Sequence, residues 1–179
     1  FYLFIYIFYI VRLHGDQLHD FGGASLAAKY NALSCDHCEH TSAAGVQAMS
    51  DAGTVAVLLP TATFFIKEKA RPPVELFREK NVSMALATNC NPGSSPCSSI
   101  LLCMNMGCTL MGLTPEEALY GVTRNAAKAI GKLSERGTIE VGKVGDFCVW
   151  GCKDLVELSY YLGLNQLVKV FKGGVVVRG

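Results

Sequence analysis

Apolar runs alternate with longer amphipathic stretches over the first two thirds of the chain. Each run is almost continuous in apolar character and stops at polar residues, which is typical of strands in a sheet covered on both faces. Four such strand–helix units in a row predict an α/β fold with a parallel sheet and covering helices. The strands are expected within residues 11–17, 34–40, 54–60 and 83–89, and the helices within 22–32, 41–53, 72–81 and 98–112.

A further helix is predicted over residues 114–130. Thr114 is a good N-cap, Pro115 suits the first helical position, and Glu117 completes a capping box with Thr114. Gly131 would end the helix, because glycine readily adopts the left-handed conformation that follows a last turn. The apolar stripe of this helix is expected from Leu119, Val122, Ala126 and Ile130.

The pattern changes at Gly137. Residues 137–154 and 167–179 are short β-runs punctuated by glycine, which predict the strands of a small antiparallel unit. We therefore expect an α/β part over residues 11–136 and a small β part over residues 137–179.

The composition fits a chain that buries a core. Of its 179 residues, 50% are hydrophobic and 17% are charged, and the formal net charge is +1. Lys and Arg are scattered rather than clustered, so we expect neither nucleic acid nor an acidic polymer as a partner.

The chain begins at Phe1 rather than at Met, which suggests a fragment of a longer protein. Residues 1–11, FYLFIYIFYIV, are uncharged, but they are shorter than the roughly 20 residues of a membrane span, so we expect no membrane partner. They also lack the basic start and the small-residue cleavage site of a signal peptide. Two interpretations stay open: a buried β-strand, or residues foreign to the parent protein.

The eight cysteines are expected to be reduced thiols of a cytoplasmic protein. The stretch CDHCEH, residues 35–40, also suggests a zinc site formed by Cys35, His37, Cys38 and His40. Because side chains alternate along a strand, however, Cys35 and His37 should face one way while Asp36 and Cys38 face the other. We therefore favour cysteine as a small core residue over cysteine as a zinc ligand.

Polar residues at the predicted strand ends are the candidates for chemistry, because catalytic side chains of an α/β barrel lie at the carboxyl ends of its strands. Two histidines on consecutive strands, with a carboxylate or amide on a later one, suggest a metal-dependent hydrolase. From spacing alone, a structural role for each of these histidines is about as common as a metal-binding role. The strand-end residues are His14, Asp16, Gln17, Asp36, His37, Pro60, Thr61, Asn89 and Asn91.

The stretch NPGSS, residues 91–95, is expected at a helix start. Backbone N–H groups there could bind an anion such as a carboxylate. A plain capping turn with Ser94 or Ser95 as the N-cap is the favoured interpretation from composition.

Five segments together resemble the imidazolonepropionase family of the amidohydrolase superfamily: residues 13–40, 52–65, 72–96, 113–133 and 137–150. The resemblance implies the second half of a (β/α)8 TIM-type barrel, strands five to eight, followed by the C-terminal strands of a small β-sandwich. Residues 1–10 have no counterpart in the family. The implied reaction is hydrolysis of 4-imidazolone-5-propanoate, a small-molecule substrate, to N-formimino-L-glutamate by a metal-activated water. The family further implies one Zn2+ or Fe3+ ion, a cytoplasmic location and a possible homodimer.

The resemblance also implies roles for individual residues. His14 corresponds to a metal ligand, and Asn89 stands where the family has an aspartate that binds the metal and accepts a proton. His37 corresponds to a catalytic histidine that polarises the substrate, and Gln17 to a position that contacts the substrate ring. The implied substrate-binding residues of the following loop are Asn91, Gly93 and Ser94.

Two departures from the family pattern lead us to expect that this chain is inactive alone. The His-x-His pair and the other site residues of the family's first half are absent from it, so the metal ligands are incomplete. An asparagine at position 89 brings no charge and accepts no proton as a carboxylate does. Another amidohydrolase activity, such as a deaminase or deacetylase, and a non-catalytic module derived from a barrel stay open as alternatives.

Overall fold

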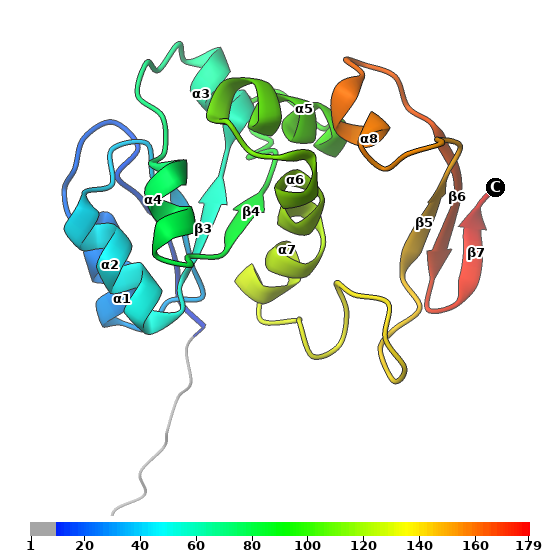
Figure 1. The fold of residues 1–179 in the computed structure, drawn as a ribbon, viewed down its shortest axis with the longest axis horizontal. Helices are drawn as coiled ribbons and strands as arrows, with labels where there is room; N and C mark the ends of the chain where they lie inside the picture. Colours follow the sequence, from blue (N-terminus) through cyan, green and yellow to red (C-terminus); the bar gives the residue numbers. More distant parts are fainter. Residues whose placement is uncertain (1–9) are drawn as a thin grey trace, which may run out of the picture.

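A computed structural model describes residues 10–179 of the chain. Its centre is a sheet of four parallel strands in the order β1-β2-β3-β4 (Figure 1). The predicted mixed α/β fold with a parallel sheet is confirmed. Of the strand that was one interpretation of residues 1–11, residues 1–9 lie outside the described residues. The strands are β1 Arg12–Gly15, β2 Ser34–His37, β3 Val55–Leu58 and β4 Met84–Leu86.

Helices follow each strand and cover the sheet, as the alternating pattern predicts. Ser42 caps α2 by accepting a hydrogen bond from the Gly45 N–H, and Gly53 ends this helix in the left-handed conformation. A short helix directly after β3 stands where a loop was expected. The helices of this part are α1 Gly23–Lys29, α2 Ala43–Ala52, α3 Pro60–Phe65, α4 Val74–Glu79 and α5 Ile100–Met111.

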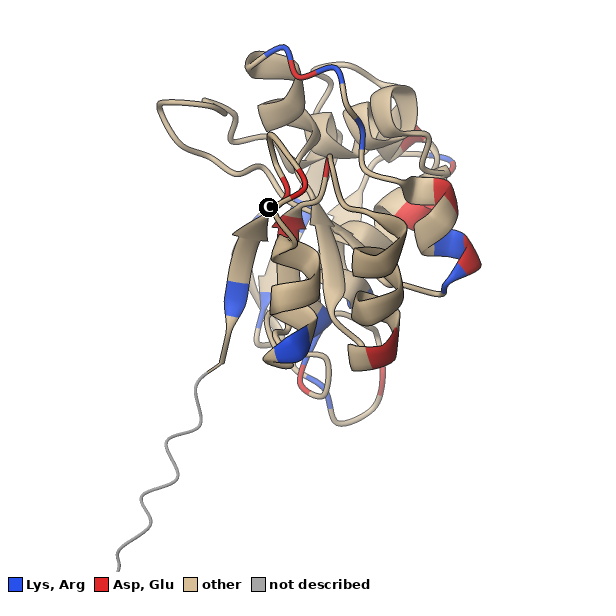
Figure 2. Cartoon of the chain, turned by 90° about the vertical axis from the view of Figure 1, so that its left-hand side faces the viewer, with Lys and Arg blue, Asp and Glu red and all other residues tan. Residues whose placement is uncertain are grey.

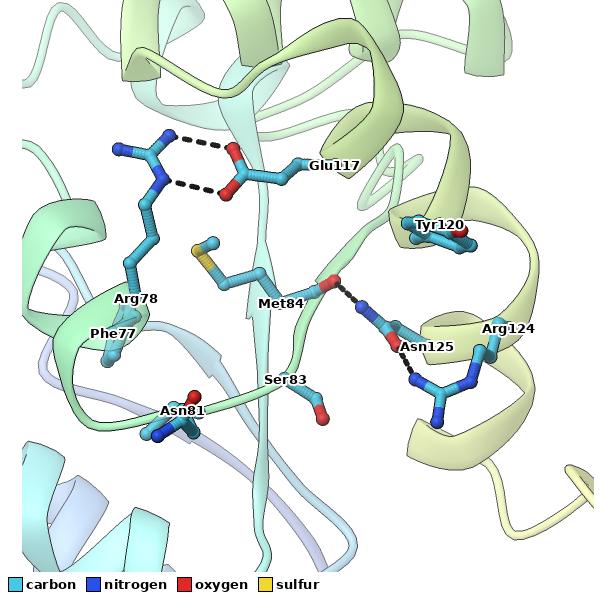
Figure 3. Close-up of a pocket in the computed structure, with 10 residues that line it drawn as sticks. Phe77, Arg78, Asn81, Ser83, Met84, Glu117, Tyr120, Arg124 and Asn125 are labelled. Carbon is cyan, nitrogen blue, oxygen red and sulfur yellow. Dashed lines mark hydrogen bonds and ion pairs between the residues drawn. The ribbon is translucent and has the colours of Figure 1, made fainter.

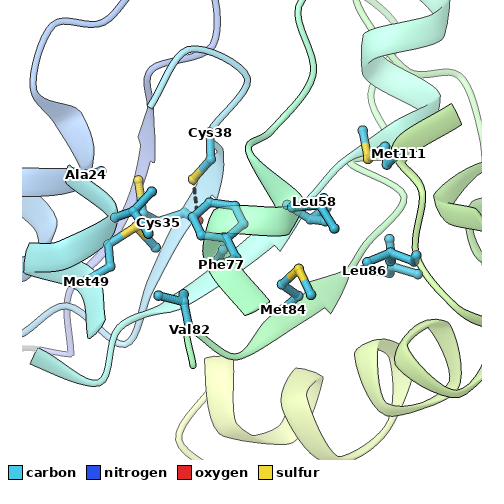
Figure 4. Close-up of a cluster of buried hydrophobic side chains, with 14 of the residues drawn as sticks. Ala24, Cys35, Cys38, Met49, Leu58, Phe77, Val82, Met84, Leu86 and Met111 are labelled. Atoms are coloured by element: carbon cyan, nitrogen blue, oxygen red, sulfur yellow. Dashed lines mark hydrogen bonds between the residues drawn. The ribbon is translucent and has the colours of Figure 1, made fainter. Parts of the chain in front are cut away.

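The hydrophobic core lies between the sheet and its covering helices (Figure 4). Phe77 of α4, Met49 of α2 and Leu58 of β3 are fully buried there. Burying a side chain of this size stabilises a fold by about 1.5–3 kcal/mol relative to leaving it exposed. The short strands are therefore held mainly by packing across the layers.

The single helix predicted over residues 114–130 is wrong, because two helices, α6 Pro115–Val122 and α7 Arg124–Ala129, occupy this stretch. The break lies at Thr123, whose φ of −120° and ψ of −95° are not helical. The predicted capping box is confirmed: Thr114 Oγ1 accepts from the Glu117 N–H, and Glu117 Oε2 accepts from the Thr114 N–H.

The buried face of these two helices matches the predicted stripe only in part: Leu119 and Val122 pack against the core, but other positions differ. Ala118 and Gly121 are buried, whereas Ile130 is 48% exposed. A Cβ at Gly121 would lie 3.3 Å from the backbone nitrogen of Leu86, so small residues allow α6 to approach β4 closely. Asn125 on α7 donates from Nδ2 to the Met84 carbonyl at 2.8 Å and covers this edge of the sheet.

The C-terminal part contains the predicted antiparallel unit, a second sheet in the order β5-β6-β7. Its strands are β5 Phe147–Trp150, β6 Leu167–Lys172 and β7 Val175–Arg178. The short helix α8 Glu157–Tyr160 links it to α5, where Asn105 Nδ2 donates to the carbonyls of Ser159 and Tyr160. No helix within residues 10–179 is long and apolar enough to cross a membrane.

Candidate active site

The carboxyl ends of β1 and β2 bring two predicted site residues together. The parallel register pairs His14 with Asp36 and Gly15 with His37. His14 Nε2 lies 3.9 Å from Asp36 Oδ2, and the ring centroids of His14 and His37 are 5.2 Å apart. The His14 side chain is 66% exposed, whereas that of His37 is only 4% exposed. One imidazole is thus free to bind a ligand, and the other is held inside the fold.

A second carboxylate lies beside the buried histidine. Glu39 Oε2 is 3.7 Å from His37 Nδ1, and the Glu39 side chain is only 1% exposed. Its other oxygen, Oε1, accepts a hydrogen bond from Thr63 Oγ1 at 2.7 Å. Neither His37 Nδ1 nor Glu39 Oε2 has a hydrogen-bond partner among the described residues.

Asp16 has a structural role in this region. Its buried carboxylate accepts from the N–H groups of Phe21, Gly23 and Ala24 and from the Thr41 hydroxyl, at 2.8–3.2 Å. These bonds hold the start of α1 and the turn after β2 against the end of β1. Figure 2 shows acidic residues together at this end of the strands. Both carboxylate oxygens of Asp16 are therefore already engaged in hydrogen bonds within the fold.

The predicted alternation along residues 35–38 is wrong at its last position. Cys35 and Cys38 are both fully buried in the same core, and Cys38 Sγ donates to the Cys35 carbonyl at 3.4 Å (Figure 4). The chain leaves the extended conformation at His37 and Cys38, whose φ values are 82° and 67°. The neighbouring Cys35 side chain and burial raise the pKa of the Cys38 thiol. The prediction that these cysteines are core residues is confirmed.

The loop after β4 is closed by its own hydrogen bonds. Asn91 Oδ1 accepts from the N–H groups of Gly93 and Ser94, and Asn91 Nδ2 donates to the Asn89 carbonyl at 2.6 Å. The expectation of a helix start at Ser94 or Ser95 is wrong, because α5 begins later with Ser99 as its N-cap.

Ser95 and Thr61 fix the start of this loop by hydrogen bonds to the Thr88 carbonyl. Ser95 is fully buried, and both hydroxyls donate to the Thr88 carbonyl, at 2.6 Å from Ser95 and 3.0 Å from Thr61. Asn89 itself is half-buried with a left-handed φ of 49°. No hydrogen bond or ion pair in the described part of the chain joins the side chains of Asn89 or Gln17 to His14 or His37.

The arrangement can supply part of a metal site. Imidazole suits zinc and iron, and an exposed strand-end histidine such as His14 is free to coordinate either ion. Within residues 10–179, however, no three His, Cys, Asp or Glu side chains converge to hold a metal ion. Further donors would therefore be needed to complete a catalytic site, which typically has three protein ligands and a water.

The sequence profile described as Amidohydrolase family matches residues 14–179, nearly the whole described chain. The chain belongs to the amidohydrolase family. The imidazolonepropionase of Methylobacterium sp. (strain 4-46) is 57% identical over 157 residues, which make up 88% of this chain and 39% of that protein. That of Rhizobium meliloti (strain 1021) is 54% identical over 169 residues, 94% of this chain and 41% of the relative. The chain thus spans about 40% of the length of the curated relatives it matches.

Solved structures of other proteins share the fold. An adenosine deaminase from Xanthomonas campestris with bound zinc has a TM-score of 0.79 at 19% identity, covering 94% of this chain and 45% of that chain. The atrazine chlorohydrolase from Arthrobacter aurescens TC1, complexed with zinc, has a TM-score of 0.73 at 16% identity, covering 83% and 37%. At such low identity the likeness shows the fold alone.

Two cavities of this amidohydrolase chain lie away from the strand-end histidines. One of about 330 Å3 lies at the amino end of β4, where Arg78 donates to both carboxylate oxygens of Glu117 at 2.7 Å (Figure 3). These bonds lower the pKa of Glu117. The other, of about 930 Å3, is a largely apolar groove between α5 and α8. Neither cavity is lined by His14 or His37.

Sequence reasoning missed Glu39, Thr63 and the outer pair His40–Glu68, whose Nε2 and Oε1 atoms are 3.7 Å apart. The position of Glu39, two residues after the strand-end His37, was the sequence feature that could have marked it as a site residue. No local signal marks Thr63, because it reaches the site from α3 through the tertiary fold.

Proposed function

We propose that the chain is part of an imidazolonepropionase, which hydrolyses 4-imidazolone-5-propanoate to N-formimino-L-glutamate. The observation that carries this proposal is the 57% identity over 157 residues with the Methylobacterium imidazolonepropionase. The close approach of the His14 and His37 rings at adjacent strand ends supports it, because the family resemblance assigns a metal ligand and a catalytic group to these positions.

In this proposal the four parallel strands are strands five to eight of a (β/α)8 barrel over residues 11–136. Residues 137–179 then contribute to a small β-sandwich. The parallel order β1-β2-β3-β4 and the separate antiparallel sheet support that division. The possible homodimer of the parent enzyme and its cytoplasmic location stay predictions.

His14 would hold the metal ion, with Asn89 as a weak second donor. The ion, zinc or iron, would supply the acidity that turns a bound water into a nucleophile near neutral pH. The zinc bound to the adenosine deaminase and to the atrazine chlorohydrolase supports zinc as the first ion to test. His37 would hydrogen-bond the substrate carbonyl as negative charge develops on it, a contribution typically worth about 2.7–4 kcal/mol.

Gln17 would contact the substrate ring, and Asn91, Gly93 and Ser94 would contact the substrate from the loop after β4. The hydrogen bonds of Asn91 to Gly93 and Ser94 support a loop of defined shape. Such a loop can present its remaining polar atoms without a large ordering cost.

The test joins the chain to the part of the Methylobacterium relative that it does not cover, and compares Asn89 with Asn89→Asp in that fusion. The carboxylate restores charge for the ion and a proton acceptor, so metal content should rise and hydrolysis should increase by about 10²–10⁴-fold. Asn81→Asp is the matched control, because Asn81 also has a left-handed φ, 56°, but precedes β4 instead of following it. It should change neither readout.

Two outcomes would contradict the proposal. Hydrolysis of deaminase or deacetylase substrates, without turnover of imidazolone propanoate, would assign the chain to another amidohydrolase. Absence of metal from both Asn89 variants would favour a non-catalytic module. That alternative is supported by the lack of three convergent His, Cys, Asp or Glu side chains within residues 10–179.

A further inference from the structure

Glu39 is a buried acid without a complete set of partners. Its Oε1 accepts from Thr63 Oγ1 at 2.7 Å, whereas Oε2 is buried and unpartnered within the described chain. Leaving a buried carboxylate oxygen unpaired is costly, so such an atom needs a physical explanation. The group that faces it is His37 Nδ1, 3.7 Å away and likewise buried and unpartnered.

The distance is longer than a hydrogen bond, which rarely exceeds about 3.2 Å for N–H···O. In unliganded active sites, hydrogen bonds between catalytic groups are often long and shorten when substrate binds. Closing this gap requires only a small movement of either side chain. Since both atoms lack any other partner among the described residues, nothing there competes for the bond.

The backbone holds this pair in place. His37 and the next residue, Cys38, both have left-handed φ values, 82° and 67°, which non-glycine residues adopt at an energetic cost. The turn is fixed by bonds from the Cys38 N–H to the Gly15 carbonyl at 3.1 Å and from the His40 N–H to the Asp16 carbonyl at 2.8 Å. Strain of this kind persists where the surrounding structure determines the geometry, and it clusters at functional sites.

We infer that Glu39 is a positioning residue for His37: it accepts a hydrogen bond from Nδ1–H and thereby determines which ring nitrogen carries the proton. Nε2 is then the nitrogen left for the reaction. To donate to the substrate carbonyl, as the proposed function requires, Nε2 must also carry a proton, and Nδ1 then keeps its own in the bond to the Glu39 carboxylate. Thr63 orients Glu39 through its hydrogen bond to Oε1. The inference rests on the proposed function in one respect, the assignment of His37 to the reaction.

The experiment reads the proton position directly in the purified chain, so it needs neither metal nor turnover. The chain has four histidines, and their ring nitrogens can be resolved by long-range proton–nitrogen NMR after labelling with 15N-histidine. His37→Gln identifies the His37 signals by their loss. We expect Nδ1 of His37 to carry a proton in the parent chain. We expect Glu39→Gln to lose that preference, because an amide N–H₂ can donate to a bare Nδ1.

Glu68→Gln is the matched control. Glu68 Oε1 lies 3.7 Å from His40 Nε2, the same distance that separates Glu39 from Nδ1 of His37, so this change should affect the His40 signals and leave those of His37 unchanged. Thr63→Val removes the donor to Glu39 and should weaken the preference of His37 while keeping the acid, which provides a second test should Glu39→Gln not fold.

A bare Nδ1 on His37 in the parent chain would overturn the inference without need of any variant. The same proton position in Glu39→Gln as in the parent would overturn it as well. Neither result would bear on the reaction proposed for the whole enzyme. Conversely, a fusion protein that fails to hydrolyse imidazolone propanoate would leave the NMR result standing.

Discussion

Replacing Asp16 by asparagine should destabilise the chain strongly, although the side chain keeps its size. The buried carboxylate accepts three backbone N–H bonds and one hydroxyl bond. In Asp16→Asn one oxygen becomes an N–H₂ group. If Oδ1 stays with Phe21 and Gly23, the new donor faces the Ala24 N–H, whereas the Thr41 hydroxyl can turn to accept.

The magnitude follows from these contacts. One buried N–H left without an acceptor costs about 1–3 kcal/mol. Loss of the negative charge at the start of α1 adds about 0.3–1 kcal/mol. The sum is about 1–4 kcal/mol, a substantial part of the total of about 5–15 kcal/mol that is typical of folded domains.

Urea denaturation followed by circular dichroism measures this difference. Asp20→Asn is the control, because exposed Asp20 accepts one bond, from the Gly22 N–H at 3.0 Å, which an asparagine oxygen can also accept. We expect a change of at most about 0.5 kcal/mol for it. Equal stability of the two variants would refute the reasoning and would free Asp16 for a role in binding or chemistry.

Two further changes test other parts of the structure. Hydrogen bonds from Arg78 lower the pKa of Glu117, so their stabilisation is present above the ordinary carboxyl pKa and is lost as the pH falls through the lowered value. Glu117→Gln should therefore be less stable than the parent by roughly 1 kcal/mol at pH 7. The difference in melting temperature between the two proteins should disappear in acid. A difference that persists in acid would show that packing alone is responsible. Burial raises the pKa of the Cys103 thiol to about 12. At pH 8, iodoacetamide should therefore modify exposed Cys90 well before Cys103, as mass spectrometry can measure. Equal rates of modification would show that the core around α5 opens readily.

Local patterns determined much of this chain without any knowledge of its tertiary structure. The four strand–helix units, the capping box of Thr114 and Glu117, and the antiparallel sheet after Gly137 were predicted correctly. Each depends on residues close in sequence: an apolar run of strand length, a cap three residues from its partner, or a glycine between two short runs. The family was also recognisable, because order and spacing of motifs survive in a partial chain. The catalytic, metal-binding and substrate-binding roles of individual residues stay predictions.

Tertiary contacts decided the features that local patterns missed. The helix over residues 114–130 breaks at Thr123, where α6 and α7 each fit closely against β4. Cys38 turns into the core beside Cys35 because the backbone enters the left-handed region after β2. Such outcomes depend on partners distant in sequence, and neither hydrophobic period nor residue spacing encodes them.

The same limit applies to the candidate site. The sequence placed His14 and His37 at neighbouring strand ends, which followed from the parallel order of consecutive strands. It did not indicate that four hydrogen bonds, one of them from Thr41 after β2, occupy the Asp16 carboxylate, or that Thr63 donates to the acid beside His37. The sequence does not show whether the oxygens of a carboxylate already accept hydrogen bonds or are free to bind a ligand. Only the folded chain decides this, because the donors come from elements that meet after the sheet and its helices have packed.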